Sequence, residues 1–77
     1  MTGMKRFGHL IRHARKAQGV TLTDLARRIN RSKTALHKME TGKQLIPVDL
    51  LPKIAEETGI HPAKLRPDLA KMLEAGR

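Results

Sequence analysis

The first part of the chain carries apolar residues at intervals of three and four, which is the period of an α-helix. These residues are Met4, Phe7, Leu10, Ile11, Ala14 and Ala17. Arginines and histidines fill the opposite face, and Gly19 interrupts the pattern. The spacing predicts an amphipathic helix that begins near Met4 and ends before Gly19.

A second helix is predicted over residues 22–29. Its apolar stripe consists of Leu22, Leu25, Ala26 and Ile29. Thr21 supplies the hydroxyl of an N-cap residue, and Asp24 follows three positions later, close to a capping box. Asn30 and Ser32 then interrupt the stripe. Because asparagine tolerates a left-handed backbone and serine favours the N-cap, they indicate a tight turn that leads into another helix.

The third helix has a narrow apolar stripe and a broad polar face. The stripe contains only Ala35, Leu36 and Met39. The residues left facing outward are Lys33, Thr34, His37 and Lys38. Thr41 and Gly42 close this helix, since a glycine is free to adopt the positive φ of a helix C-terminus. Residues 22–41 therefore predict two short helices joined by a short turn.

The rest of the chain predicts a loop over residues 43–47, a fourth helix over 48–58, and a shorter fifth helix opened by His61-Pro62. Pro52 fits the fourth helix if Asp49 is its N-cap, because a proline in the first turn loses no hydrogen bond. Pro67 opens a C-terminal helical tail over 67–77. A chain of 77 residues leaves room for one domain, so we expect 1–77 to form a single all-α domain.

The positive charge of the chain is concentrated in its first half. Residues 1–38 carry ten lysines and arginines against one acid, Asp24, whereas residues 39–77 carry six basic and six acidic residues. The whole net charge of +9 therefore arises before residue 39. Such a one-sided positive field attracts polyanions. The candidate partners are therefore nucleic acid, an anionic membrane surface and an acidic protein.

Catalytic and metal-binding patterns are missing from the sequence. It contains no cysteine, no glycine-rich phosphate loop and no nucleophile elbow. His9 and His13 are one helical turn apart, a spacing that can hold zinc, but no third ligand accompanies them. We therefore expect no enzyme activity, no metal and no cofactor. No apolar run approaches the length of a membrane span.

The polar face of the third helix suits the major groove of DNA, which admits one helix and is read by groups on the outward side of that helix. Lysine donates to guanine, threonine hydrogen-bonds or touches a thymine methyl, and histidine donates to guanine or phosphate. An ordinary solvated helix face is the alternative. The charge asymmetry over the same region favours DNA.

From Phe7 to Leu65 the sequence resembles, without a gap, the Cro and phage-repressor class of helix-turn-helix domains, also called the XRE family. The matches are Phe7-Gly8, Arg15, Gly19-Val20-Thr21, Leu25-Ala26, Ile29, Ser32, Leu36, Met39-Glu40, Gly42-Lys43, Ile54-Ala55, Thr58-Gly59 and Leu65. A narrower likeness, carried above all by Leu65-Arg66-Pro67-Asp68-Leu69, is to YdaS-type, Cro-like regulators of prophages. The resemblance implies a compact five-helix, lambda-repressor-like domain with its helix-turn-helix motif over 22–41 and its recognition helix over about 33–41.

The resemblance also implies roles for individual residues. Those that would contact bases are Lys33, Thr34, His37 and Lys38. Those that would contact phosphate are Thr23, Arg27, Arg31, Ser32, Thr41, Lys43 and Gln44. Arg15 and Glu40 fall where the family often has an ion pair. Leu22 departs from the family, which commonly has a phosphate-binding glutamine there, so that anchor is missing or is replaced by Thr23 or Arg27.

We interpret the chain as a DNA-binding transcriptional regulator, a Cro-like repressor of a phage or mobile element that binds a palindromic operator as a homodimer. Its expected location is the cytoplasm, at the nucleoid of a bacterial cell or a phage-infected host. Leu69, Met72 and Leu73 either form the dimer contacts or cap the core of the monomer.

Two other interpretations compete with this one. In the first, the chain is the antitoxin of a toxin–antitoxin pair, which binds a toxin and represses its own operon, although few residues follow Leu69 to hold a toxin. The basic first helix also suits a membrane surface. The gapless resemblance to DNA-binding domains disfavours the second alternative, and no membrane partner is expected.

Overall fold

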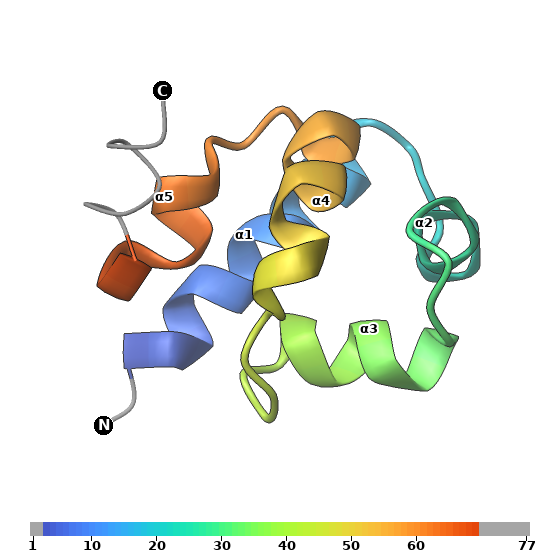
Figure 1. Cartoon of the computed structure of the whole chain (residues 1–77). Helices are drawn as coiled ribbons and strands as arrows, with labels where there is room; N and C mark the ends of the chain where they lie inside the picture. Colours follow the sequence, from blue (N-terminus) through green and yellow to red (C-terminus); the bar gives the residue numbers. More distant parts are fainter. Residues whose placement is uncertain (1–2, 70–77) are drawn as a thin grey trace.

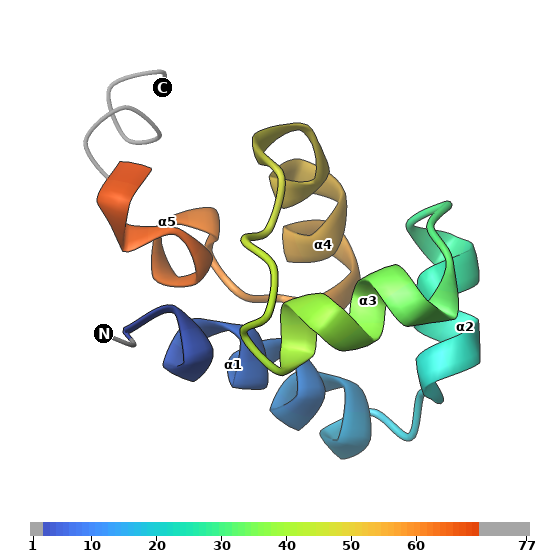
Figure 2. The ribbon, with the colours of Figure 1, turned by 90° about the horizontal axis from the view of Figure 1, so that it is seen from below.

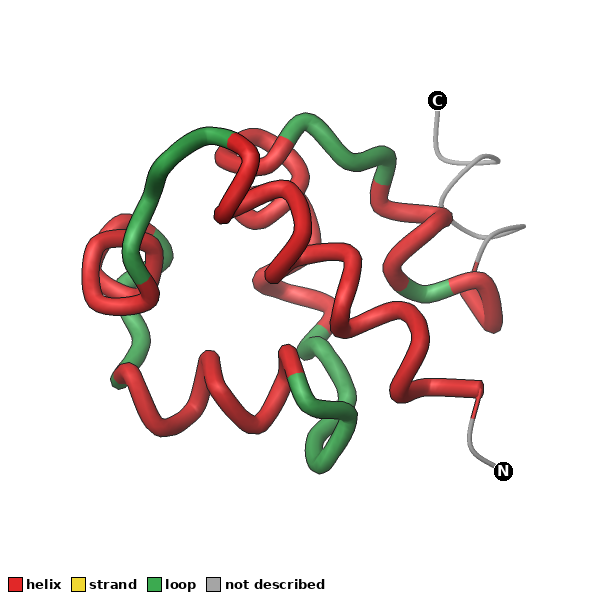
Figure 3. The backbone as a smooth tube through the Cα atoms, turned by 180° about the vertical axis from the view of Figure 1, so that it is seen from behind, coloured by secondary structure: helices red, strands yellow, loops and turns green. Residues whose placement is uncertain are grey.

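The structure, a computed structural model, describes the backbone of residues 3–69 and the side chains of residues 7–69. Its elements are α1 (Gly3–Ala17), α2 (Leu22–Arg28), α3 (Lys33–Glu40), the 3-10 turn η1 (Val48–Leu50), α4 (Leu51–Thr58), α5 (Pro62–Leu65) and the 3-10 turn η2 (Pro67–Leu69). The described residues form helices and loops without a strand (Figure 3). The all-α, five-helix class expected from the sequence is confirmed.

α1 lies at the centre of the arrangement, in contact with α3, α4 and α5. α2 packs against α3, and α4 packs against α5. Figure 1 shows α3 in the lower part of the domain, with α2 above its right-hand end and α5 on the opposite side of the molecule. In Figure 2, seen from below, α3 and α1 lie side by side on one face.

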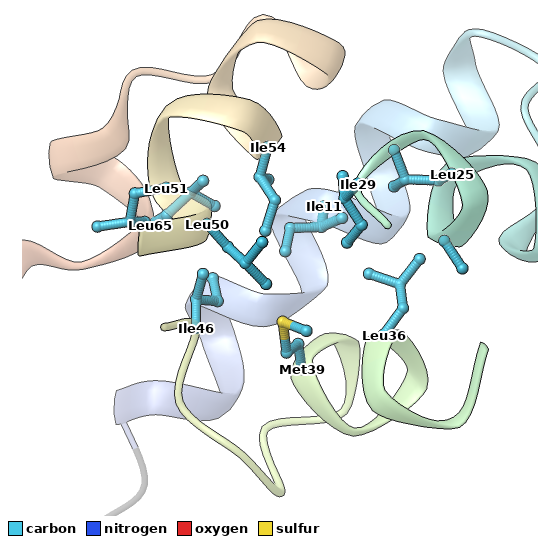
Figure 4. Packing of buried hydrophobic residues seen from close by; sticks show 11 residues of the cluster. Ile11, Leu25, Ile29, Leu36, Met39, Ile46, Leu50, Leu51, Ile54 and Leu65 are labelled. Atoms are coloured by element: carbon cyan, nitrogen blue, oxygen red, sulfur yellow. The ribbon is translucent and has the colours of Figure 1, made fainter. Parts of the chain in front are cut away.

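An aliphatic core holds the helices together, and every helix contributes to it (Figure 4). Its members are Ile11, Leu25, Ala26, Ile29, Leu36, Met39, Ile46, Leu50, Leu51, Ile54 and Leu65. Burial of each large aliphatic side chain stabilises the fold by about 1.5 to 3 kcal/mol. Because Leu36 and Met39 of α3 lie in this core, the orientation of α3 is fixed by packing against several elements.

α1 approaches the C-terminal end of α3 closely at Gly8, which is buried. A Cβ atom on Gly8 would collide with the carbonyl oxygen of Met39 and would lie 3.2 Å from the carbonyl oxygen of Glu40. The missing side chain therefore allows the two helix backbones to come together.

The caps expected around the turn between the second and third helices are confirmed. The Thr21 hydroxyl accepts a hydrogen bond from the Asp24 amide at 3.0 Å, and the Ser32 hydroxyl accepts one from the Ala35 amide at 3.0 Å. Asn30 is left-handed, with φ of 60°. α2 ends at Arg28, one residue earlier than expected, because Ile29 is its C-cap.

The expected start of the fourth helix is wrong. The 3-10 turn η1 precedes α4, whose N-cap Leu50 makes no side-chain hydrogen bond, and Pro52 lies in the first turn. The Asp49 carboxylate, expected as the cap, instead accepts a hydrogen bond from Arg31 Nη2 at 3.3 Å. Pro52 has no N–H group, so the uncapped first turn of α4 contains one fewer amide that needs an acceptor.

The Arg66 guanidinium connects the end of the described chain to the loop before η1 through hydrogen bonds. Its Nη1 donates to the Ile46 carbonyl at 2.7 Å, and its Nε and Nη2 donate to the two Asp68 carboxylate oxygens at 3.0 and 2.8 Å. Leu69 is half-buried and packs against the core of its own chain. Met72 and Leu73, and residues 70–77 of the tail expected over 67–77, lie outside the described residues.

The hydrogen bonds between Arg66 and Asp68 lower the pKa of Asp68 and raise that of Arg66. The folded chain therefore gains stability from the Asp68 carboxylate above its ordinary pKa of 3.8, and loses it as the pH falls through the lower folded value. Asp68→Asn is expected to be less stable than the wild type at pH 7, by under about 1 kcal/mol because the Asp68 side chain is exposed. Urea unfolding at several pH values from 7 to 2 should show the difference in the free energy of unfolding between the wild type and Asp68→Asn decreasing toward zero. A difference that stays constant over this range would contradict the assignment.

Candidate nucleic-acid interface

α2, the turn and α3 form a helix-turn-helix unit whose geometry is set by backbone hydrogen bonds. The Arg31 amide donates to the Ala26 carbonyl at 2.9 Å, which closes the turn at the end of α2. Ala26 is only 3% exposed, and α2 and α3 are in contact. The hydrogen bond at the turn, the contact between the helices and the N-cap of each helix together fix the angle between α2 and α3.

α3 divides into a buried side and an outward side. Leu36, Met39 and Glu40 are buried. The four residues expected to contact bases, Lys33, Thr34, His37 and Lys38, are all exposed. Figure 2 shows α3 at the front of the face, with its outer side uncovered by the other described helices. The four side chains thus occupy one outward surface, which we call the reading face.

The residues expected to contact phosphate flank the reading face. They are Thr23 and Arg27 on α2, Arg31 and Ser32 before α3, and Thr41, Lys43 and Gln44 after it. All are exposed except Thr41, whose hydroxyl donates to the His37 carbonyl at 2.9 Å. Arg27 lies 3.6 Å from Asp24, and Arg31 lies 3.3 Å from Asp49, so these two arginines already have carboxylate partners.

Arg15 and Glu40 link α1 to the end of α3. Arg15 Nε and Nη2 donate to the two Glu40 carboxylate oxygens at 2.9 and 3.2 Å, and Arg15 Nη1 donates to the Val20 carbonyl at 3.1 Å. The two side chains are 10% and 3% exposed. This buried pair fixes α3 against α1 and against the connection that leads to α2.

The ion pairs leave an excess of positive charge beside the reading face. Each of the six acids among residues 7–69 lies within 4.0 Å of a lysine or arginine. The basic residues without such a partner in this range are Arg12, Lys16, Lys33, Lys38, Lys43 and Lys64. All except Lys64 belong to α1, α3 or the loop after α3.

Arg12 and Lys16 were missing from the residues expected to form the site. They lie on α1 and line a groove beside α3 together with His37 and Thr41. The signal in the sequence was their spacing of four on the polar side of the first helix, in a stretch without an acid before Asp24. That pattern did not reveal that this side of α1 adjoins α3.

His9 and His13, the two histidines one helical turn apart, lie on α1. The His9 and His13 rings meet edge to face with centroids 5.6 Å apart, and residues 7–69 bring together no group of three metal-ligating side chains. Among the described helices, none has the length and apolar character needed to cross a bilayer.

The comparisons with known proteins agree with this geometry. A sequence model of a helix-turn-helix domain family matches residues 6–69. The chain belongs to this family. Helix-turn-helix domains bind DNA, so this one is a non-enzymatic DNA-binding protein. The XRE and YdaS-type likenesses, which are finer than this family, stay predictions.

This helix-turn-helix protein is also similar to a solved structure, that of the clp gene regulator ClgR from Corynebacterium glutamicum. The two share 25% sequence identity with a TM-score of 0.72, and the similarity covers 95% of this chain and 78% of that one. No curated protein matches the chain.

Proposed function

We propose that this helix-turn-helix protein is a sequence-specific transcriptional regulator that inserts α3 into the major groove of double-stranded DNA. The observation that carries the proposal is the reading face, whose four exposed polar residues stand on a helix anchored by buried contacts on its other side. The similarity to a clp gene regulator supports a role in transcription.

The chemistry of the reading face suits the edges of base pairs. Lys33 and Lys38 donate to guanine O6 and N7, Thr34 meets a thymine methyl or an acceptor, and His37 donates to guanine. Lys43 and Gln44, in the loop after α3, supply phosphate contacts on one flank. Arg27 and Arg31 exchange exposed carboxylate partners for phosphate at low cost, because such ion pairs contribute under about 1 kcal/mol.

The finer proposal is a repressor of the Cro-like, phage or mobile-element type that acts as a homodimer. One recognition helix reads too few base pairs for useful specificity. Two copies on a palindrome, with half-sites about 34 Å apart, would double the contact. In this proposal residues 1–77 form one domain with its motif over 22–41.

A binding titration tests the proposed function. The purified protein is titrated against the DNA upstream of its own gene and against a scrambled duplex, each at low and near-physiological salt. Tight binding that survives salt only on the native DNA is the expected result, and a symmetric footprint would support the dimer. Equal, salt-labile binding to both duplexes would contradict sequence-specific regulation at that site.

Substitutions should separate base reading from phosphate contact. Lys38→Ala and His37→Ala are expected to reduce discrimination between the operator and single-base variants by about 1 to 3 kcal/mol for each affected base pair. Lys43→Ala is expected to weaken all duplexes almost equally and to lower the salt slope by about 0.9. The measurement is the affinity for a panel of duplexes at several salt concentrations. Unchanged base preference in Lys38→Ala and His37→Ala would show that the reading face is misassigned.

A further inference from the structure

A groove runs between α1 and the C-terminal half of α3 and reaches the first residue of α2. The side chains that matter here are His9, Arg12 and Lys16 of α1, Leu22 of α2, and His37 and Thr41 at the end of α3. α1 and α3 border one another on the face that Figure 2 presents. The groove is therefore part of the same side of the molecule as the reading face.

The charge of the groove is set by Arg12 and Lys16. Glu40 is the acid that lines the groove, and Arg15 neutralises it through two hydrogen bonds. Arg12 and Lys16 are exposed and have no acid of residues 7–69 within 4.0 Å. Because they are four residues apart on one helix, both extend over the same surface.

Leu22 stands where the groove meets the reading face. It lines the groove, and it also lines a second hollow with Lys33, Thr34 and His37. Its side chain offers no hydrogen-bond donor, and the Thr41 hydroxyl already donates to the His37 carbonyl. In the groove itself, the cationic side chains without an acid partner among residues 7–69 are Arg12 and Lys16 of α1, so an anion bound there meets these two charges.

We infer that Arg12 and Lys16 form a second phosphate-binding surface, which holds the DNA strand that borders the major groove occupied by α3. The inference rests on the proposed function, since it places α3 in that groove. Its ligand is the phosphodiester backbone, because the groove is continuous with the reading face through Leu22 and His37. Arginine binds phosphate through two parallel hydrogen bonds, and lysine adds a point charge.

The test is the salt dependence of DNA binding by the full chain with Arg12→Gln and Lys16→Gln combined. The slope of log K against log salt is expected to fall by about 1.8, since each lost phosphate contact removes about 0.9. The fall should be equal for an operator duplex and a scrambled duplex, so the preference between them stays unchanged. Both side chains are exposed, and thermal unfolding followed by circular dichroism checks that the fold is kept.

Lys64→Gln is the matched control, because Lys64 is also exposed and without an acid partner among residues 7–69 but lies on α5, which makes no extensive contact with α3. Its slope should equal that of the wild type. Lys43→Gln tests the proposed function separately. If the slope falls in Lys43→Gln but is unchanged in the double variant, Arg12 and Lys16 do not bind the DNA backbone. The inference is then overturned, and the proposed function is not. Wild-type protein that binds no duplex would overturn both.

Two further outcomes would also overturn the inference. A loss of affinity confined to the operator duplex would mean that Arg12 and Lys16 read bases rather than phosphates. Binding to phosphatidylglycerol vesicles that disappears in the double variant, while the DNA slope is unchanged, would assign the surface to a membrane.

Discussion

Glu40→Ala is expected to lower the free energy of unfolding by about 3 to 5 kcal/mol. The Glu40 side chain is 3% exposed, and its carboxylate accepts two hydrogen bonds from Arg15. Removing it leaves a guanidinium that is 10% exposed without its counter-ion between α1 and α3. Such a charge is costly because little water reaches it and the Val20 carbonyl then remains as its hydrogen-bond partner in place of a carboxylate. Urea unfolding followed by circular dichroism measures the change.

Glu56→Ala provides the matched control for this prediction. Glu56 pairs with Lys53 at 3.7 Å, but its side chain is 71% exposed. The loss of an exposed pair is expected to cost under about 1 kcal/mol. If Glu40→Ala and Glu56→Ala lose equal stability, the buried pair does not hold α1 and α3 together.

Gly8→Ala is expected to destabilise the domain by about 1 to 3 kcal/mol, although alanine is the better helix former at an exposed position. The added Cβ would meet the Met39 carbonyl oxygen, which belongs to the backbone of α3 and cannot rotate away. α3 must therefore move away from α1, so affinity for DNA should fall as well. Thermal unfolding and a DNA titration well below the unfolding temperature measure the two effects.

Gly19→Ala separates the effect of crowding from that of glycine's flexibility. Gly19 has φ of 70°, and a Cβ there would meet nothing within 4 Å. Its substitution should cost about 1 to 2 kcal/mol through backbone strain, with DNA affinity of the folded protein unchanged. Equal losses of DNA affinity in both variants would show that the close contact at Gly8 does not set the position of α3.

The sequence alone predicts those parts of the fold that depend on neighbours along the chain. The apolar period identified the first four helices of the described chain, and His61-Pro62 marked the fifth. Thr21 and Ser32 were identified as N-caps from their own side chains. The Asp49 cap was wrong because the 3-10 turn η1 places the start of α4 at Leu51, and the Asp49 carboxylate binds Arg31, eighteen residues away in the chain. Helix and capping propensities depend on neighbours along the chain, so they cannot predict that a side chain will bind a residue distant in the sequence.

The sequence also predicts one part of the candidate site, the exposed face of the third helix, but not the groove beside it. The stripe on the third helix indicated which side of it would be exposed, since burial of Leu36 and Met39 leaves only one free face. The groove beside it was missed, because the position of Arg12 and Lys16 relative to α3 depends on how two helices cross. That crossing depends on Gly8, and no pattern in the sequence separates a glycine at a helix contact from a glycine on a helix surface.

The hydrogen bonds of Arg66 also have a thermodynamic consequence. One guanidinium binds Asp68 near the end of the described chain and the carbonyl of Ile46, which follows Lys43 and Gln44 in the same loop. The buried Ile46 side chain holds the same loop to the core, so the loop is fixed from both its backbone and its side chain. Linkage is reciprocal: by whatever factor the Arg66–Ile46 hydrogen bond favours DNA binding through this loop, bound DNA favours that hydrogen bond.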